Sequence, residues 1–240
     1  MKLNTFAVTD IGMKRKNNQD SFLKDDSLGL YVVADGMGGH RGGEVASRLA
    51  VEVIQKFCQE NRHLPGREML DRAINLSCSE IFTHSLQHEE LTGMGTTVIA
   101  MLFLFQEEAI YIGQVGDSRA YLMTEKGIWQ VTEDHSLLNE EIRAGRIAAG
   151  QAHNYQFKNV ITRSVGYESH VMVDIYRRKV QLGDIYLSCT DGLSGLVEIS
   201  EMAEELRKRG PEEGLKRLVA MANERGGDDN ITALVCEVGA

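Results

Sequence analysis

The sequence contains little that would divide it into separate parts. Only 2 of its 240 residues are proline, and no stretch rich in proline, serine or glycine interrupts it as a linker would. The hydrophobic content of 42% is enough for a sizeable packed core. We therefore expect a single domain over residues 1–240, without internal repeats or low-complexity segments.

Long apolar runs are also missing. No segment approaches the roughly 18 apolar residues of a membrane-spanning helix, and the first residues lack the apolar stretch of a signal peptide. These absences lead us to expect a cytoplasmic protein with no membrane partner. Monomer is the default expectation for its oligomeric state.

The chain has no excess of positive charge. Its 26 Lys and Arg residues face 35 Asp and Glu residues, which gives a net charge of −9. A protein that grips nucleic acid neutralises the phosphate backbone with an extended basic surface. The charge balance therefore argues against a nucleic-acid partner.

Closely spaced cysteines are absent as well. The 4 cysteines are Cys58, Cys78, Cys189 and Cys236, and none of them forms a Cys-x-x-Cys pair. This spacing argues against disulfides and against thiolate zinc sites. We expect all four to be small buried hydrophobic residues.

The periods of the apolar residues predict strands interrupted by paired helices. Continuous or alternating apolar runs indicate strands, and apolar pairs every three to four positions indicate helices. We expect strands over 5–8, 21–23, 28–34, 96–105, 109–115, 119–123, 128–131, 171–180, 185–188 and 231–238, and helices over 45–57, 69–82, 137–143, 201–209 and 212–224. The strand over 28–34 should be buried on both faces, and those from 96 to 188 should form an antiparallel meander. Strand runs bracketed by helix pairs predict an α+β layered sandwich.

Residues 134–169 break the periodic pattern. After a short helical stretch, glycine and polar residues follow without clear period. Such a segment is typical of a mobile lid over a site, and a packed loop is the alternative. We call residues 134–169 the flap.

Four aspartates stand where an apolar run meets a turn. They are Asp35, Asp117, Asp191 and Asp229, and each lies beside a glycine or an asparagine. Carboxylates at strand ends can converge on one rim of a sheet, where they repel one another unless protons or cations neutralise them. Oxygen ligands select hard divalent ions such as Mg²⁺ or Mn²⁺ rather than zinc. The pattern indicates a multi-metal hydrolase.

Residues 35–43 join a strand to a helix through a glycine-rich turn. A nucleotide-binding loop is the competing interpretation, but Arg41 occupies the third glycine position and Asp35 would face the pyrophosphate. The metal interpretation uses the Asp35 carboxylate and the backbone carbonyl of Gly36, which glycine lets approach an ion. An aspartyl nucleophile is disfavoured because Met37 stands where a second aspartate would be expected.

The segment over residues 9–20 supplies a guanidinium close to a carboxylate. Arginine grips phosphate through paired N–H bonds that lysine cannot reproduce. Arg15 precedes Asp20 by five residues, ahead of the strand that leads to Asp35. We expect Arg15 to point inward, although a basic triplet taken alone is more often solvated surface.

Seven motifs, in this order, resemble the metal-dependent serine/threonine protein phosphatases of type 2C in their compact bacterial form. The motifs are Arg15-Lys16-Asn17-Asn18-Gln19-Asp20, Asp35-Gly36-Met37-Gly38-Gly39-His40, Gly95-Thr96-Thr97, Val115-Gly116-Asp117-Ser118-Arg119, Thr132-Glu133-Asp134-His135-Ser136, Thr190-Asp191-Gly192-Leu193 and Gly226-Gly227-Asp228-Asp229-Asn230-Ile231-Thr232. Each motif alone is weak, but together they span almost the whole chain. The resemblance implies a four-layer α-β-β-α sandwich, with two antiparallel sheets flanked by helix pairs and a small flap subdomain.

The resemblance also implies a Mn²⁺ or Mg²⁺ site. Asp35 would bridge two ions, with Asp191 and Asp229 completing the first and the carbonyl of Gly36 on the second. Asp20 would hold water on the second ion. A water turned to hydroxide by both ions would attack the phosphorus directly.

The remaining roles follow from the same resemblance. Asp117 would join Asp191 in a weaker third metal site. Arg15 would hold the phosphate oxygens of the substrate and stabilise the transition state. His40 would protonate the leaving alkoxide, and a metal-bound water is the alternative acid. Gln19 stands where some members have glutamate, so the second ion would be held mainly through waters.

Three functions stay open at this stage. The first is a protein phosphatase that hydrolyses phosphoserine and phosphothreonine and opposes protein kinases. The second is a phosphatase dedicated to a single regulatory partner. The third is a non-catalytic module that binds phosphopeptides, which the presence of Arg15, Asp35, Asp191 and Asp229 disfavours.

Overall fold

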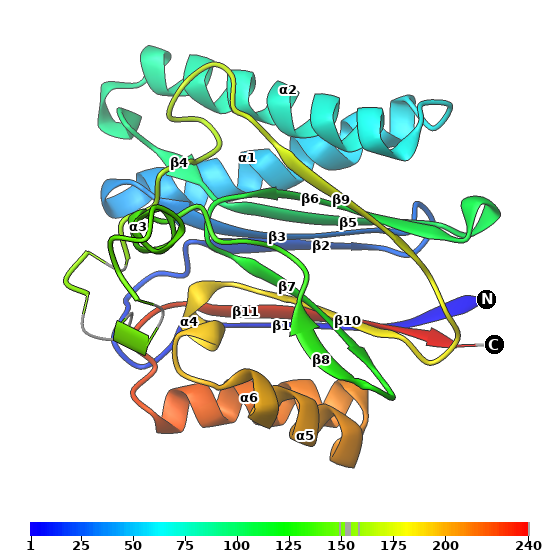
Figure 1. Cartoon of the computed structure of the whole chain (residues 1–240). Coiled ribbons are helices and arrows are strands. Elements are labelled where there is room, and N and C mark those ends of the chain that lie inside the picture. Colours follow the sequence, from blue (N-terminus) through cyan, green and yellow to red (C-terminus); the bar gives the residue numbers. More distant parts are fainter. Residues whose placement is uncertain (149, 152–154, 158, 240) are drawn as a thin grey trace.

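The computed structural model describes residues 1–148, 150–151, 155–157 and 159–239, and the side chains of residues 39–41 lie outside the description. Two antiparallel sheets stack face to face, with one helix pair on each outer face (Figure 1). The expected α+β sandwich with helices on both sides is confirmed. No helix of the described residues is long and apolar enough to cross a membrane.

The first sheet lies under helices α1 (Gly39–Glu60) and α2 (Gly66–Gln87). Its strands run in the order β2-β3-β5-β6-β9, and the short strand β4 pairs with β3. Their bounds are β2 (Asp20–Asp25), β3 (Leu30–Met37), β4 (Gly95–Thr96), β5 (Val98–Leu104), β6 (Ala109–Val115) and β9 (Asp174–Lys179). Two short 3-10 helices, Glu89–Leu91 and Phe105–Glu107, lie at its connections.

The second sheet lies over helices α5 (Ile199–Arg209) and α6 (Pro211–Glu224). Its strands run in the order β1-β11-β10-β7-β8. Their bounds are β1 (Lys2–Asp10), β7 (Arg119–Thr124), β8 (Gly127–Gln130), β10 (Ile185–Cys189) and β11 (Ile231–Gly239). A four-residue helix, α4 (Asp191–Ser194), follows β10 and was not predicted.

Three layers of buried side chains explain why the sheets stack in this way. One layer fills the space between α1, α2 and the first sheet, a second separates the two sheets, and a third lies under α5 and α6. Strand β3 serves two layers, because Leu30, Val32 and Ala34 face the helices while Tyr31 and Val33 face the other sheet. The prediction that this strand is buried on both faces is confirmed.

The predicted continuous meander is wrong, although β5 pairs with β6 and β7 pairs with β8 as expected. Strands β6 and β7 follow one another in the chain but belong to different sheets, and the chain crosses between them at Gly116, whose φ is +99°. Strand β6 then pairs with β9, and β7 pairs with β10. A strand buried on both faces has no polar side to show which sheet it joins, so the pattern of apolar residues alone left this crossing open.

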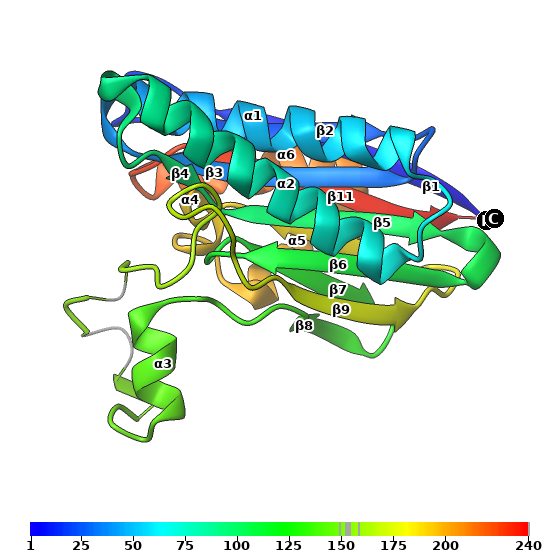
Figure 2. The same cartoon turned by 90° about the horizontal axis from the view of Figure 1, so that it is seen from above.

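The flap carries the predicted short helix, α3 (Leu137–Arg143), which stands away from the sheets (Figure 2). Its return segment is tied to the body of the fold, because Val165 pairs with Thr96 of β4 through two backbone hydrogen bonds of 2.8 and 2.9 Å. A further bridge joins Ile161 to Ser136. The flap's action as a lid stays a prediction.

The four cysteines are free and buried, as predicted. Burial raises the pKa of the Cys58 thiol to about 12. A thiol in such surroundings stays protonated and behaves as a small apolar residue.

Candidate active site

Two of the predicted carboxylates face each other across neighbouring strands. Asp20 opens β2, and Asp35 lies directly opposite it near the end of β3. Residues paired in this way project from the same face of an antiparallel sheet, with their Cβ atoms about 5 Å apart. The first sheet therefore brings Asp20 and Asp35 together at one end.

The second sheet delivers two more carboxylates to the same end of the sandwich. Asp191 opens α4 just after β10, and Asp229 lies two residues before β11. The Thr190 hydroxyl donates to Asp20 Oδ2 at 3.0 Å and accepts from the backbone N–H of Thr232 at 3.0 Å. This buried threonine joins the two sheets at the point where the carboxylates meet.

The electrostatics of Asp35 identify its neighbours. Burial raises the pKa of Asp35 well above its ordinary value, and four nearby negative charges raise it further. These charges belong to Asp20, Asp191, Asp229 and Asp117, which are the predicted metal-site carboxylates. The convergence expected from their positions at strand ends is therefore present in the fold.

The other carboxyl groups also hold protons more tightly than usual. Burial raises the pKa of Asp20 to about 7, while hydrogen bonds from Thr232 and Thr190 oppose the rise. Burial and the charge of Asp229 raise the pKa of Asp191, which a hydrogen bond with Asp35 lowers. Carboxylates crowded in this way require protons or cations to coexist.

Asp117 sits on the turn at which the chain passes between the sheets. Burial raises its pKa to about 7, the charges of Asp191 and Asp134 add to the rise, and Arg119 opposes it. Arg119 itself forms a bidentate ion pair with Asp134, with contacts of 2.7 to 3.0 Å. Asp117 therefore lies at the edge of the cluster, on the side of Asp191.

Two buried oxygen atoms show that the cluster fits a cation. Asp20 Oδ1 and Asp191 Oδ1 are shielded from solvent and have no hydrogen-bond partner. Buried polar atoms without partners are rare and costly, and an unplaced ion is one of their ordinary explanations. Over the described part of the chain, however, no three His, Cys, Asp or Glu side chains already stand as a closed ligand set. The carboxylates are therefore neighbours that do not form a complete ligand set in the described structure.

Glycine is required around the backbone of Gly36. A Cβ atom at Gly36 would lie 2.0 Å from the carbonyl oxygen of Gly43, and one at Gly43 would lie 2.5 Å from that of Gly36. The strand end and the first turns of α1 therefore approach more closely than any side chain would allow. The structure thus requires glycine at residue 36 for packing against α1, and the approach of its carbonyl to an ion stays a prediction.

Arg15 reaches the cluster from the loop between β1 and β2. Its Nη2 atom lies 2.5 Å from Asp229 Oδ2, and its side chain remains half-exposed. The guanidinium contacts a predicted metal-ligand residue, but the side chain is exposed rather than turned fully inward. A half-exposed guanidinium beside the carboxylates is also accessible to a phosphate from solvent.

Asn230 holds this loop, a role that was not predicted from its sequence. Its Oδ1 accepts from the backbone N–H of Gln19 at 2.8 Å, and its Nδ2 donates to the carbonyls of Ile11 and Asn17. A buried amide with three backbone partners fixes both ends of the segment that carries Arg15. The only signal in the sequence was a polar residue between Asp229 and an apolar strand.

His40 is the second residue of α1. Its side chain lies outside the described residues, so its predicted role as the acid stays a prediction.

Comparisons with known proteins agree with this geometry. The family model described as protein phosphatase 2C matches residues 13–235. The serine/threonine phosphatase stp of Listeria monocytogenes is 39% identical over 237 residues, which cover 95% of this chain and 93% of that protein. The crystal structure of the Mycobacterium tuberculosis phosphatase PstP/Ppp matches with a TM-score of 0.93 and 32% identity, covering 100% of both chains. A PstP catalytic domain in complex with 2 manganese ions matches with a TM-score of 0.89 and 33% identity over 99% of each chain. The chain belongs to the serine/threonine phosphatases of the protein phosphatase 2C family, in their compact bacterial form.

Proposed function

We propose that this chain hydrolyses phosphoserine and phosphothreonine in proteins by direct attack of water on phosphorus, and so opposes protein kinases. The observation that carries the proposal is the meeting of buried, unpartnered oxygens of Asp20 and Asp191 beside the guanidinium-bearing loop. Acidic ligands and a cation that grips phosphate are the two requirements of metal-assisted phosphoryl transfer.

The carboxylates divide into a core set and an edge residue. Asp35, Asp191 and Asp229 would hold a first ion, and Asp35, Asp20 and the Gly36 carbonyl would serve a second. Asp117 and Asp191 would hold a weaker third ion. Bound Mn²⁺ or Mg²⁺ would acidify water and screen the charge of the phosphate. Manganese is the first choice to test, since the PstP catalytic domain was solved with 2 manganese ions.

Arg15 binds and orients the substrate in this proposal. A guanidinium has five N–H donors in a planar fork. The contact to Asp229 uses Nη2, so the same side chain can remain beside the cluster while other N–H groups bind phosphate oxygens. The fixed positive charge then lies next to the reacting group, where it stabilises charge in the transition state.

The leaving serine or threonine alkoxide needs a proton. We assign this role to His40, because imidazole titrates near working pH and α1 begins just beyond Asp35. Water is the alternative donor, and the choice between them is tested below. Residues 1–240 act as one catalytic domain in this proposal, and the flap over residues 134–169 borders the site and selects the target protein. Cytoplasmic location and a monomeric state stay predictions.

Hydrolysis of p-nitrophenyl phosphate tests whether the protein is an enzyme. Activity with millimolar Mn²⁺ is expected, and its loss in Asp191→Ala ties that activity to this site. An inactive but phosphopeptide-binding protein would instead favour the non-catalytic module. A panel of unrelated phosphopeptides then separates a broad enzyme from a phosphatase dedicated to one partner, which would turn over a single member of the panel.

A further inference from the structure

His135 holds the residue before Asp117 from two sides. It follows β8 and is only 6% exposed. Its backbone N–H donates to the Gly116 carbonyl at 3.0 Å, and its ring Nδ1 accepts from the Gly116 N–H at 3.1 Å. The first bond comes from the backbone and does not depend on the side chain, whereas the second needs an acceptor at the position of Nδ1.

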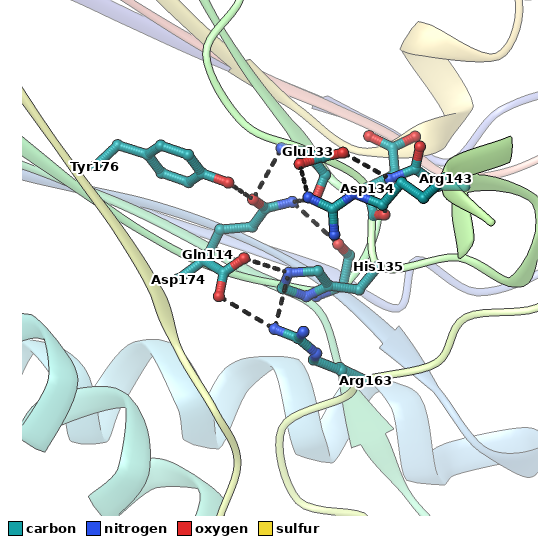
Figure 3. Close-up of polar contacts among 10 residues, drawn as sticks. Gln114, Glu133, Asp134, His135, Arg143, Arg163, Asp174 and Tyr176 are labelled. Carbon is teal, nitrogen blue, oxygen red and sulfur yellow. Dashed lines mark hydrogen bonds and ion pairs between the residues drawn. The ribbon is translucent and has the colours of Figure 1, made fainter. Parts of the chain in front are cut away.

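The second bond requires one tautomer of the ring. A backbone N–H can only donate, so Nδ1 must be unprotonated, and the proton of the neutral ring must sit on Nε2. Nε2 lies 3.1 Å from Asp174 Oδ2 on β9, an acceptor for that proton (Figure 3). Burial lowers the pKa of His135, which favours the neutral ring. Asp174 therefore selects the form of His135 that can receive the Gly116 N–H.

Arg163 also binds the carboxylate of Asp174. Its Nη1 donates to Asp174 Oδ1 at 3.1 Å and lies 3.3 Å from His135 Nε2 (Figure 3). Arginine has no acceptor, so the approach to a protonated Nε2 is a contact between two donors that share Asp174. Asp174 thus receives one N–H from Arg163 and one from the His135 ring.

The turn that carries Asp117 is also anchored on its other side. Ser118 Oγ lies 2.7 Å from Thr97 Oγ1, and Thr97 exchanges two hydrogen bonds of 2.9 and 3.0 Å with the backbone of Asp35. Gly116 has φ +99°, and a Cβ there would lie 2.6 Å from Thr97 Cγ2. The turn that carries Asp117 is therefore held at Gly116 by His135 and at Ser118 by Thr97, which also binds the backbone of Asp35.

We propose that His135 is a positioning residue for the edge metal site: its Nε2–H tautomer, selected by Asp174, fixes the Gly116 peptide and with it the carboxylate of Asp117, and Arg163 holds Asp174 in place. The inference rests on the proposed function, because it assumes that Asp117 binds the weaker ion. Residues that orient a ligand typically change metal affinity by about 10- to 100-fold when they are replaced.

Three substitutions separate positioning from simple packing. Asparagine places a side-chain oxygen near the position of Nδ1, so His135→Asn keeps an acceptor for the Gly116 N–H. Glutamine extends toward the position of Nε2, so His135→Gln keeps a link to Asp174 but loses that acceptor. In Asp174→Asn, Arg163 still donates to the side-chain oxygen, and the amide NH₂ then faces Nε2. Because that NH₂ can only donate, the ring proton must move to Nδ1. Asp→Asn changes beside catalytic histidines of other enzymes act through the tautomer in the same way.

The test measures Mn²⁺ binding by calorimetry, with thermal unfolding of the metal-free proteins as the check on folding. His135→Gln and Asp174→Asn should each lower the affinity for the most weakly bound Mn²⁺ about tenfold, and the affinities for the more tightly bound ions should not change. His135→Asn should retain most of the affinity, and the exposed-histidine control His63→Gln should match the parent. Long-range ¹⁵N–¹H NMR should show Nε2–H for His135, with its signals identified by their loss in His135→Asn.

Two results would overturn the inference alone. One is an Nδ1–H tautomer in the parent protein. The other is that His135→Asn and His135→Gln lower the affinity for the weakly bound Mn²⁺ equally and also lower thermal stability equally. That result would mean that the ring contributes only to packing. Asp117→Ala separates this inference from its premise: if that variant still binds every ion, the edge site and the role of His135 both fall, while the core-site activity stands.

Discussion

The Thr190 hydroxyl donates a hydrogen bond of 3.0 Å to Asp20 Oδ2, although the two residues are 170 positions apart in the chain. One oxygen of Asp20 is thereby fixed to the opposite sheet, while the other, Oδ1, is buried without a partner. The protein thus orients this carboxylate through one oxygen and leaves the other without a hydrogen-bond partner. The stability of the metal-free protein should therefore depend on the protonation of Asp20.

Metal-free protein should lose stability as the pH rises from about 4 to about 7. The pKa of Asp20 is about 7 in the fold, against 3.8 as the ordinary value, because burial and then the neighbouring carboxylates disfavour its charge. Between these values the folded chain holds a proton that the unfolded chain has released, so stability falls with rising pH. For Asp20 alone the full loss is on the order of 4 kcal/mol.

Asp20→Asn removes this titration and tests its source. Asparagine keeps an oxygen for Thr190 and is neutral at every pH. In urea unfolding of metal-free protein, the variant should be more stable than the parent at pH 8, and the gap should close toward pH 4. A variant as unstable as the parent at pH 8 would show that the carboxylate of Asp20 is not the strained group.

Asp191→Ala should abolish turnover. The residue opens α4 beside Asp35, and its Oδ1 is one of the two buried oxygens without a partner. Removal of a metal ligand should lower kcat/KM by at least about 100-fold and lower Mn²⁺ affinity in parallel. The matched control is Asp228→Ala, an exposed aspartate that precedes Asp229 and pairs with Lys14. Near-parental rates in Asp191→Ala would rule out its role as a ligand.

Arg15→Ala should separate substrate binding from metal binding. The guanidinium contacts Asp229 but is half-exposed toward solvent, so its loss should raise KM, lower kcat and reduce kcat/KM by about 100-fold. Bound Mn²⁺, counted by calorimetry, should be unchanged. Lys14→Ala, one residue earlier, controls for the loss of surface charge. Loss of metal with unchanged KM would instead make Arg15 a structural partner of Asp229.

His40→Ala should distinguish leaving groups. If His40 supplies the proton, the variant should slow hydrolysis of a phosphothreonine peptide far more than that of p-nitrophenyl phosphate, because p-nitrophenolate leaves without a proton. The ratio of the two kcat values is the measurement. Equal losses on both substrates would remove His40 from the role of acid.

The strands, helices and converging carboxylates were predictable because each leaves a local signal. Asp35, Asp117, Asp191 and Asp229 each stand at the end of an apolar run, and strand ends on one side of a sandwich meet in space. The crossing at Gly116 was not predictable from apolar period, since β6 and β7 each contact two buried layers and show no solvent face. The partner sheet of such a strand is set by the whole packing.

The roles of Thr190 and Asn230 were missed for a different reason. Both residues lie inside motifs that were recognised, but what they do depends on atoms far away in the chain: Asp20 Oδ2 for Thr190, and the backbone of Gln19 for Asn230. A hydroxyl or amide beside a carboxylate is common in turns, and its sequence context does not identify a distant partner. Only the fold shows that these two side chains connect the halves of the site.

Phosphate release from a phosphothreonine peptide, measured after exhaustive chelation and during titration with Mn²⁺, tests the central claim most directly. The account predicts that chelated protein is inactive, that Mn²⁺ restores turnover, and that calorimetry on the same sample counts at least two ions for each active chain. Undiminished hydrolysis after chelation, or full activity with fewer than two bound ions, would contradict it.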